Sequence, residues 1–240
     1  CMPLQIPVMF EKPFSFSLAD AQQMEALSKK FSTKIFTNFP SIWYPGFMEL
    51  VKRKNEIGNI NKIIMHGGHR GPVEIGCSKE FLNWLTDDTK NGGGAITDFG
   101  CYGASIMTAL MNGAKPTSVF AVTRTLKPAV YTKVDDDANI VLEYPIATGI
   151  IQASWNWPYT IMDVEVYSDK KYFYAAEYHA AGHAPFLTTK DGRKTDTLQL
   201  SAPQYKDEVA YLTDVIKNGA AATNPLLSLE YNMVIVTILD

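Results

Sequence analysis

Residues 91–103 read NGGGAITDFGCYG, in which three consecutive glycines precede an aspartate and a tyrosine four residues apart. A glycine run cannot fill a core, so it serves a tight backbone or the close approach of another group. The residues that follow predict a helix from about Asp98 to Met111. Positions i and i+4 share a helix face, so Asp98 and Tyr102 are expected side by side. They form a workable acid and base pair, although such helix-start acids are more often structural.

The first 40 residues predict a strand, a helix and a second strand. An apolar run at 8–10 ends at Glu11-Lys12-Pro13, Ser17 is placed to cap a helix, and a second apolar run covers 34–39. This order is typical of a βαβ unit in a parallel sheet. Lys12 then lies at the carboxyl edge of that sheet, where ligands bind in such folds. A solvated loop lysine is the alternative.

Strands dominate the sequence after residue 117. Four of them, at 138–145, 149–157, 161–168 and 170–176, are close together and predict an antiparallel meander. Helices are expected at 47–54, 80–88, 205–217 and 229–240, and a further strand at 61–68. The second part of the chain is therefore predicted as an α+β arrangement.

Three residues outside the glycine-rich stretch are candidates for substrate contacts. Ile151, Ala153 and Trp155 alternate with polar residues, so one face of their strand is core and the other faces water or a ligand. Trp155 could form an aromatic wall of the kind on which sugars stack, with core packing as the alternative. His69 and Arg70 lie in a glycine-rich loop and are candidates for polar contacts.

Composition and charge limit the classes of function that the protein could have. The 240 residues carry a formal net charge of −3 and only short basic runs, which argues against a nucleic-acid partner. No apolar run approaches the roughly 20 residues that a membrane-spanning helix needs. Three scattered cysteines make no disulfide framework and favour a reducing compartment, so the cytoplasm is expected, with the periplasm as the alternative. No metal site is expected, because the spacing of His66, His69, Cys77 and Cys101 matches no zinc pattern.

The order of these motifs resembles the Gfo/Idh/MocA family of NAD(P)-dependent oxidoreductases: EKP after a strand, a βαβ segment, NGGGAITDFGCYG, then an antiparallel sheet. The resemblance implies an α/β remnant, the end of a Rossmann-type parallel sheet, followed by an α+β domain with a large open, mostly antiparallel sheet and flanking helices. Residues 1–40 would be the remnant of the NAD(P)-binding domain. Residues 41–240 would form the domain that binds substrate and builds a homo-oligomer.

The resemblance also implies roles for particular residues. Glu11, Lys12 and Pro13 match the EKP motif that contacts the cofactor, NAD or NADP, and the Lys12–Pro13 bond is expected to be cis. Lys12 also contacts the substrate, a sugar or polyol, and lowers the pKa of Tyr102. Asp98 matches the aspartate of the second motif and orients substrate or tyrosine. Tyr102, which stands where most members have histidine, transfers the hydroxyl proton. The glycine run would let these groups approach the nicotinamide.

One expected element is missing from the sequence. No G-x-G-x-x-G fingerprint occurs in the 240 residues. The chain opens without an initiator methionine and closes on an apolar helix, so a piece of a longer protein, inactive by itself, is expected. Its parallel strands would have unpaired edges and favour non-native association. Two alternatives stay open: a non-catalytic sugar-binding or oligomerisation module, and an NAD-dependent enzyme that cleaves glycosidic bonds by oxidation and elimination.

Overall fold

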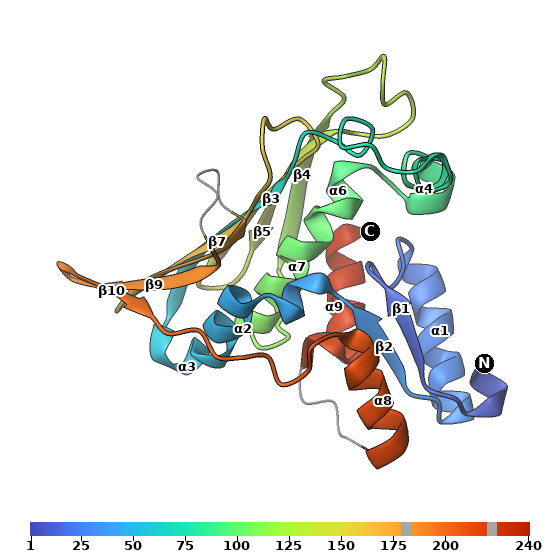
Figure 1. Ribbon diagram of the computed structural model, residues 1–240, viewed down its shortest axis with the longest axis horizontal. Coiled ribbons are helices and arrows are strands. Elements are labelled where there is room, and N and C mark those ends of the chain that lie inside the picture. The colour runs from blue at the N-terminus through green and yellow to red at the C-terminus, as the bar shows by residue number, and fades with distance from the viewer. Residues whose placement is uncertain (179–183, 220–224) are drawn as a thin grey trace.

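The computed structural model describes residues 1–178, 184–219 and 225–240. It contains a two-stranded sheet near the N-terminus and an eight-stranded sheet formed by later residues. Figure 1 shows α7 (Gly100–Leu110) and α9 (Leu229–Leu239) between the large sheet and the N-terminal unit. Every residue of α7 is buried, so this helix is the centre of the core.

The N-terminal unit confirms the predicted βαβ arrangement. Strands β1 (Val8–Glu11) and β2 (Ile35–Asn38) pair in parallel and are joined by α1 (Leu18–Phe31). The helix begins where the sequence indicated, because the Ser17 hydroxyl accepts a hydrogen bond from the Asp20 N–H at 3.3 Å. The carboxyl end of β1 therefore delivers Lys12 to the sheet edge.

The large sheet is mostly antiparallel, as predicted, with the strand order β10-β9-β8-β7-β3-β6-β5-β4. The bounds of its strands are β3 Ile60–Gly68, β4 Ser118–Arg124, β5 Asp137–Glu143, β6 Thr148–Ser154, β7 Ile161–Ser168, β8 Tyr172–Tyr178, β9 Phe186–Asp191 and β10 Lys194–Leu198.

The predicted meander is wrong at one place, because β3 lies between β6 and β7. It runs parallel to β6 and antiparallel to β7. The connection from β6 to β7 crosses the end of β3, where the His69 N–H bonds Ser154 O at 3.0 Å and the Trp157 N–H bonds His69 O at 3.1 Å. The hairpin of β9 and β10 was also missed; its turn holds Gly192 at φ 59°.

Helices cover one face of this sheet in Figure 1. The remaining helices are α2 Pro45–Lys52, α3 Lys54–Ile57, α4 Lys79–Leu85, α5 Asp88–Asn91, α6 Ala95–Asp98 and α8 Glu208–Asn218, with 3-10 turns η1 Met2–Leu4, η2 Pro40–Trp43 and η3 Pro225–Leu227. The single helix predicted from Asp98 to Met111 is in fact two, α6 and α7, which meet at Phe99. Asp98 ends the first helix, and Tyr102 lies in the first turn of the second.

The glycine run packs against the protein itself. A Cβ atom added to Gly94 would lie 1.8 Å from the backbone oxygen of Asp135, and one added to Gly92 would lie 2.5 Å from Phe16 Cβ. The Asp135 carboxylate also accepts hydrogen bonds from the N–H groups of Gly94 and Ile96, both at 2.8 Å. The run therefore allows close contact with the 134–135 loop and with Phe16. Its role in the approach of a ligand stays a prediction.

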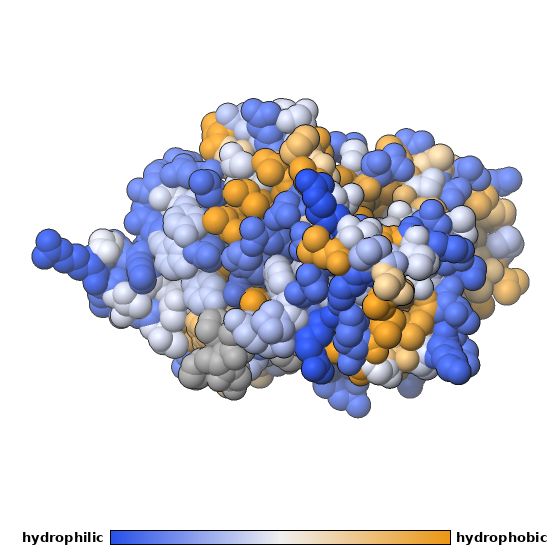
Figure 2. All heavy atoms as spheres, turned by 90° about the horizontal axis from the view of Figure 1, so that it is seen from above, coloured by the Kyte–Doolittle hydropathy of each residue, from blue (hydrophilic) through white to orange (hydrophobic). Residues whose placement is uncertain are grey.

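The outer surface bears on the predicted association. Within the described part of the chain, β1 pairs on one edge only, while β2 has an isolated bridge from Phe36 to Ser228 on its other side. Leu4, Ile6 and Leu27 near this unit are exposed, and Figure 2 shows apolar surface at the right-hand end, where Figure 1 places β1 and α1. The homo-oligomer stays a prediction. Among the described residues no helix combines the length and apolar character needed to cross a membrane.

A buried carboxylate ties the large sheet to α2. Glu177, near the end of β8, is 5% exposed, and its Oε1 accepts the N–H groups of Gly46 at 2.5 Å and Phe47 at 3.0 Å. Burial raises the pKa of Glu177 to about 7, although the two N–H donors lower it. The folded chain therefore holds this proton more tightly than the unfolded chain does.

This carboxyl makes stability fall as the pH rises. Because the pKa is raised on folding, the contribution of Glu177 is most favourable below its ordinary range and is lost by the time the pH passes about 7. We expect the loss to reach about 3 kcal/mol between pH 4.5 and 7.5, and Glu177→Gln to remove that part of the pH dependence. Urea unfolding of both proteins at several pH values measures it; parallel pH profiles would contradict the assignment.

Candidate active site

A partly buried ion pair joins the N-terminal unit to the domain of the large sheet. Lys12 Nζ lies 2.6 Å from Asp98 Oδ1 and donates to the Asp98 backbone oxygen at 2.9 Å. The two side chains are 16% and 14% exposed. Burial lowers the pKa of Lys12, but the Asp98 carboxylate more than offsets this, so the pKa lies above its usual value. Lys12 therefore stays charged at neutral pH. The Lys12–Pro13 peptide bond is cis, as the resemblance implied.

Tyr102 lies beside this pair. The Lys12 ammonium is 4.7 Å from the centre of the Tyr102 ring, which is 8% exposed. Burial raises the pKa of the Tyr102 phenol, and the Lys12 charge lowers it by less. The predicted influence of Lys12 is thus present but outweighed, and the phenol is neutral at pH 7. The described residues give its hydroxyl no hydrogen-bond partner.

Trp155 lies behind the carboxylate of Asp98. Its ring is 0% exposed, and its Nε1–H donates to Asp98 Oδ2 at 3.0 Å. The Trp155 backbone oxygen accepts from Lys127 Nζ at 2.7 Å, and the Tyr131 ring is 5.1 Å away, centre to centre. A ring with no exposed face cannot stack on a sugar, so the structure places Trp155 as a support of Asp98 and not as a wall. The inward alternation of its strand was the signal for this role.

Of the two residues predicted to make polar contacts, His69 lies near the ion pair and Arg70 lies on the surface. His69 is half-buried; its Nδ1 accepts from the Gly71 N–H at 2.8 Å, and its ring lies 5.0 Å from that of Phe99. Burial lowers the pKa of His69, although the charge of Asp98 raises it. His69 is therefore neutral and near the ion pair. Arg70 is exposed, and its role stays a prediction.

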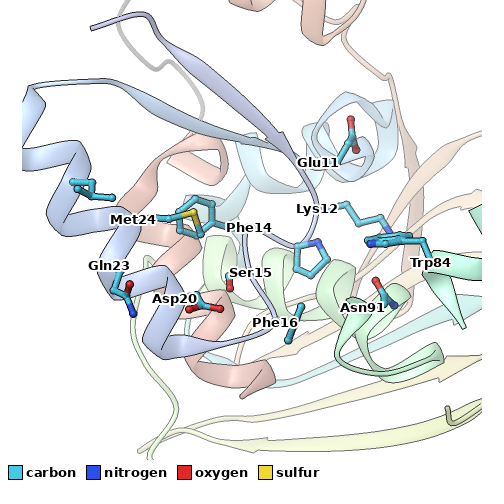
Figure 3. Close-up of a pocket in the computed structure, with 12 residues that line it drawn as sticks. Glu11, Lys12, Phe14, Ser15, Phe16, Asp20, Gln23, Met24, Trp84 and Asn91 are labelled. Atoms are coloured by element: carbon cyan, nitrogen blue, oxygen red, sulfur yellow. The ribbon is translucent and has the colours of Figure 1, made fainter. Parts of the chain in front are cut away.

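Two adjoining cavities open beside Lys12. One of about 390 Å³ is lined by Glu11, Lys12, Pro13, Phe81, Trp84, Leu85, Asn91 and Asp98. The other, of about 500 Å³, shares five of these residues and extends along α1 (Figure 3). The predicted cofactor residues thus face one space, with Glu11 also accepting from Asn38 Nδ2 at 2.9 Å. The sequence gives no signal for Phe81, Trp84 and Asn91 as lining residues, because α4 and α5 come to Lys12 only through the tertiary fold.

Metal-binding residues do not gather in the parts of the chain that the structure describes. No group of three or more histidine, cysteine, aspartate or glutamate side chains there could hold an ion. The charged centre of the site is therefore the pair of Lys12 and Asp98.

Comparison with known proteins identifies the family. The sequence profile of the GFO/IDH/MocA C-terminal domain matches residues 49–174. The chain belongs to the GFO/IDH/MocA family. It is 29% identical over 140 residues to the trans-1,2-dihydrobenzene-1,2-diol dehydrogenase of Xenopus tropicalis, covering 57% of this chain and 38% of that protein. The Xenopus laevis enzyme of the same name is 30% identical over 141 residues, with the same coverage. The match thus spans about two fifths of the length of these relatives.

Solved structures of the family share the fold. The aldose-aldose oxidoreductase from Caulobacter crescentus, complexed with glycerol, superposes with a TM-score of 0.80 at 21% identity, over 99% of this chain and 69% of that one. GenD2 from gentamicin A biosynthesis, in complex with NAD, superposes with a TM-score of 0.75 at 20% identity, over 99% of this chain and 68% of that one. At these identities the likeness establishes the fold, and the site must be argued from this chain's own residues.

The support of Asp98 by Trp155 can be measured as a coupling. Trp155→Phe replaces the indole with a smaller phenyl ring, so Asp98 loses a donor and a cavity is left in the core, and we expect the free energy of unfolding to fall by about 2 kcal/mol or more. In a double-mutant cycle with Asp98→Asn, the coupling should be about 1 kcal/mol or more. Urea unfolding gives these values. Trp157→Phe is the matched control, and its effect on the free energy of unfolding should add to that of Asp98→Asn. If the effects of Trp155→Phe and Asp98→Asn are additive as well, the Trp155–Asp98 hydrogen bond contributes nothing to stability.

Proposed function

We propose that this chain is part of an NAD(P)-dependent oxidoreductase that moves a hydride to or from a carbon bearing a hydroxyl. The observation that carries the proposal is the arrangement of Lys12, Asp98 and Tyr102: a buried ion pair at 2.6 Å with a neutral phenol whose ring lies 4.7 Å from the ammonium. A proton donor and a fixed positive charge at one place suit a reaction in which an oxygen gains or loses charge.

The residues around Lys12 suit the nicotinamide ring of the cofactor. The cavities at the carboxyl end of β1 offer the Lys12 ammonium, the Asn91 amide and the Trp84 ring, which suit a polar, flat nicotinamide. Relatives were solved with NAD, in GenD2, and with NADP, in the 3-ketoreductase KijD10. When bound, the nicotinamide supplies or accepts the hydride. The residues that hold the pyrophosphate are not among those identified in this chain.

The side chains of the site have different roles in the proposed proton transfer. During reduction of a carbonyl, the Tyr102 O–H gives its proton to the oxygen, and the Lys12 charge stabilises the phenolate that remains. During oxidation the same steps run backwards, and the phenolate takes the hydroxyl proton. Asp98 keeps Lys12 in place and is itself held by the Trp155 N–H.

The substrate is proposed to be a sugar, a polyol or a cyclic diol. The curated relatives are named for a cyclic diol, and the Caulobacter enzyme is an aldose-aldose oxidoreductase with bound glycerol. All of these molecules carry hydroxyls on neighbouring carbons. One hydroxyl can meet Lys12, which lines both cavities and lies beside the Tyr102 ring, while another binds elsewhere in the cavity.

Dinucleotide binding tests the function directly. We would titrate the chain, and the same chain extended by residues encoded upstream of Cys1, with NADH and NADPH while following nicotinamide and protein fluorescence. We expect the extended form to bind and to oxidise a polyol or cyclic diol. Binding by neither form contradicts the proposal. Tight binding by the printed chain alone would instead contradict the predicted domain division at residue 40.

Replacement of the phenol tests the proton transfer. In the form that binds dinucleotide, Tyr102→Phe removes the proton donor and leaves the ring in place. We expect kcat to fall about 10²-fold to 10³-fold, with little change in KM. Tyr159→Phe, at a tyrosine that is 48% exposed, is the control and should keep wild-type turnover. Unchanged kcat in Tyr102→Phe would exclude Tyr102 as the acid.

A further inference from the structure

Asn91 places a hydrogen-bond acceptor beside the ion pair. It is the last residue of α5, is 3% exposed, and lines both cavities. Its Nδ2 donates to Gly93 O at 2.7 Å, which fixes the orientation of the amide. Its Oδ1 accepts no hydrogen bond from the described residues, and Figure 3 shows the side chain near Lys12 and Trp84. In place of water, this oxygen can therefore accept an N–H or O–H donor from a ligand that enters the cavities.

An aromatic wall stands next to this acceptor. Phe81 and Trp84 of α4 line the smaller cavity with their ring centres 5.9 Å apart and their planes inclined by 38°. They are 45% and 42% exposed. Large aromatic side chains this exposed beside a buried ion pair offer a surface for the face of a ring.

The charges at the cavity point to the kind of ligand. The positive charge of Lys12 is neutralised by Asp98, and Glu11 adds a second carboxylate, so an anion gains little there. Asn91 Oδ1 is a hydrogen-bond acceptor, so a ligand that carries an N–H or O–H group can donate to it. The wall of Trp84 and Phe81 favours an apolar ring face over a chain that carries a hydroxyl on every carbon.

We propose that Asn91 and Trp84 form a subsite for a six-membered ring that carries a hydrogen-bond donor, with the ring face on Trp84 and the donor on Asn91 Oδ1. This subsite rests on the proposed function and names two residues that would determine specificity. Two molecules share the required chemistry: the nicotinamide ring with its carboxamide N–H groups, and a cyclic substrate whose second hydroxyl lies next to the reacting carbon.

Direct binding of small rings tests the subsite without turnover. The probes are nicotinamide and trans-cyclohexane-1,2-diol, each beside an analogue without the donor, N,N-diethylnicotinamide and trans-1,2-dimethoxycyclohexane. The Trp84 indole and Asn91 amide signals in ¹⁵N NMR spectra report binding. We expect at least one donor-bearing probe to shift both signals, and its analogue to bind about tenfold more weakly, as the loss of one hydrogen bond implies.

Two variants and a control separate the contributions. Asn91→Leu, similar in size but without the acceptor, should weaken the bound probe about tenfold. Trp84→Leu, at an exposed position where the fold does not depend on the ring, should weaken it by about fivefold. Asn61→Leu, on exposed β3 surface, should change nothing. If Trp84→Leu and a folded Asn91→Leu both bind the probe as tightly as the wild-type protein does, the proposed subsite is wrong. It is also wrong if the analogues without the donor bind as tightly as the probes.

The outcome also assigns the source of the ring. In the dinucleotide-binding form, a raised Kd for NADH in the two variants assigns the subsite to the nicotinamide. A raised KM for the cyclic diol at unchanged Kd for NADH assigns it to the substrate. If the wild-type protein binds no dinucleotide, the proposed function fails, whereas the small-ring titrations still decide the subsite by themselves.

Discussion

The structure depends on one partly buried ion pair between residues 86 positions apart in the chain, Lys12 and Asp98. Removing two charges from water costs several kcal/mol for each, which their attraction repays only when further hydrogen bonds satisfy the remaining groups. Those bonds are present: Lys12 also donates to the Asp98 backbone oxygen, and Trp155 donates to the second carboxylate oxygen. Because either charge alone would be left partly buried and unpaired, the pair holds the βαβ unit against α6.

The parts of this site that the sequence could predict are those fixed by local pattern. A strand followed by EKP places Lys12 at a sheet edge, and the apolar alternation at Ile151 and Ala153 extends to Trp155, which directly follows β6 and is buried. The predicted single helix over Asp98 and Tyr102 is interrupted at Phe99, which keeps φ −100° and ψ −29°. The Tyr102 N–H bonds Phe99 O at 3.1 Å, an i to i−3 contact. The two residues still reach Lys12, since the ends of α6 and α7 meet at its ammonium.

What could not be predicted depends on contacts between distant segments. The insertion of β3 between β6 and β7 leaves no local signal, because adjacent strands in sequence are paired by default. The glycine run meets Asp135, about 40 residues away, and no spacing rule indicates that the clash at Gly94 would be with a backbone oxygen. Asn91 and Trp84 come beside Lys12 for the same reason. Short helices with ordinary composition gave no cue that they line a cavity.

The electrostatic balance of the site follows from burial more than from charge. The pKa of Tyr102 is raised because burial disfavours the phenolate by more than the Lys12 charge favours it. Much of that charge is already engaged by Asp98, which also keeps Lys12 protonated. The resting phenol is therefore protonated, the state that the proposed carbonyl reduction needs, while the proposed alcohol oxidation needs the less stable phenolate. In the proposed reaction, a ligand hydroxyl that draws the ammonium partly away from Asp98 would strengthen the effect of Lys12 on the phenol, so Asp98 would set how far Lys12 assists proton removal.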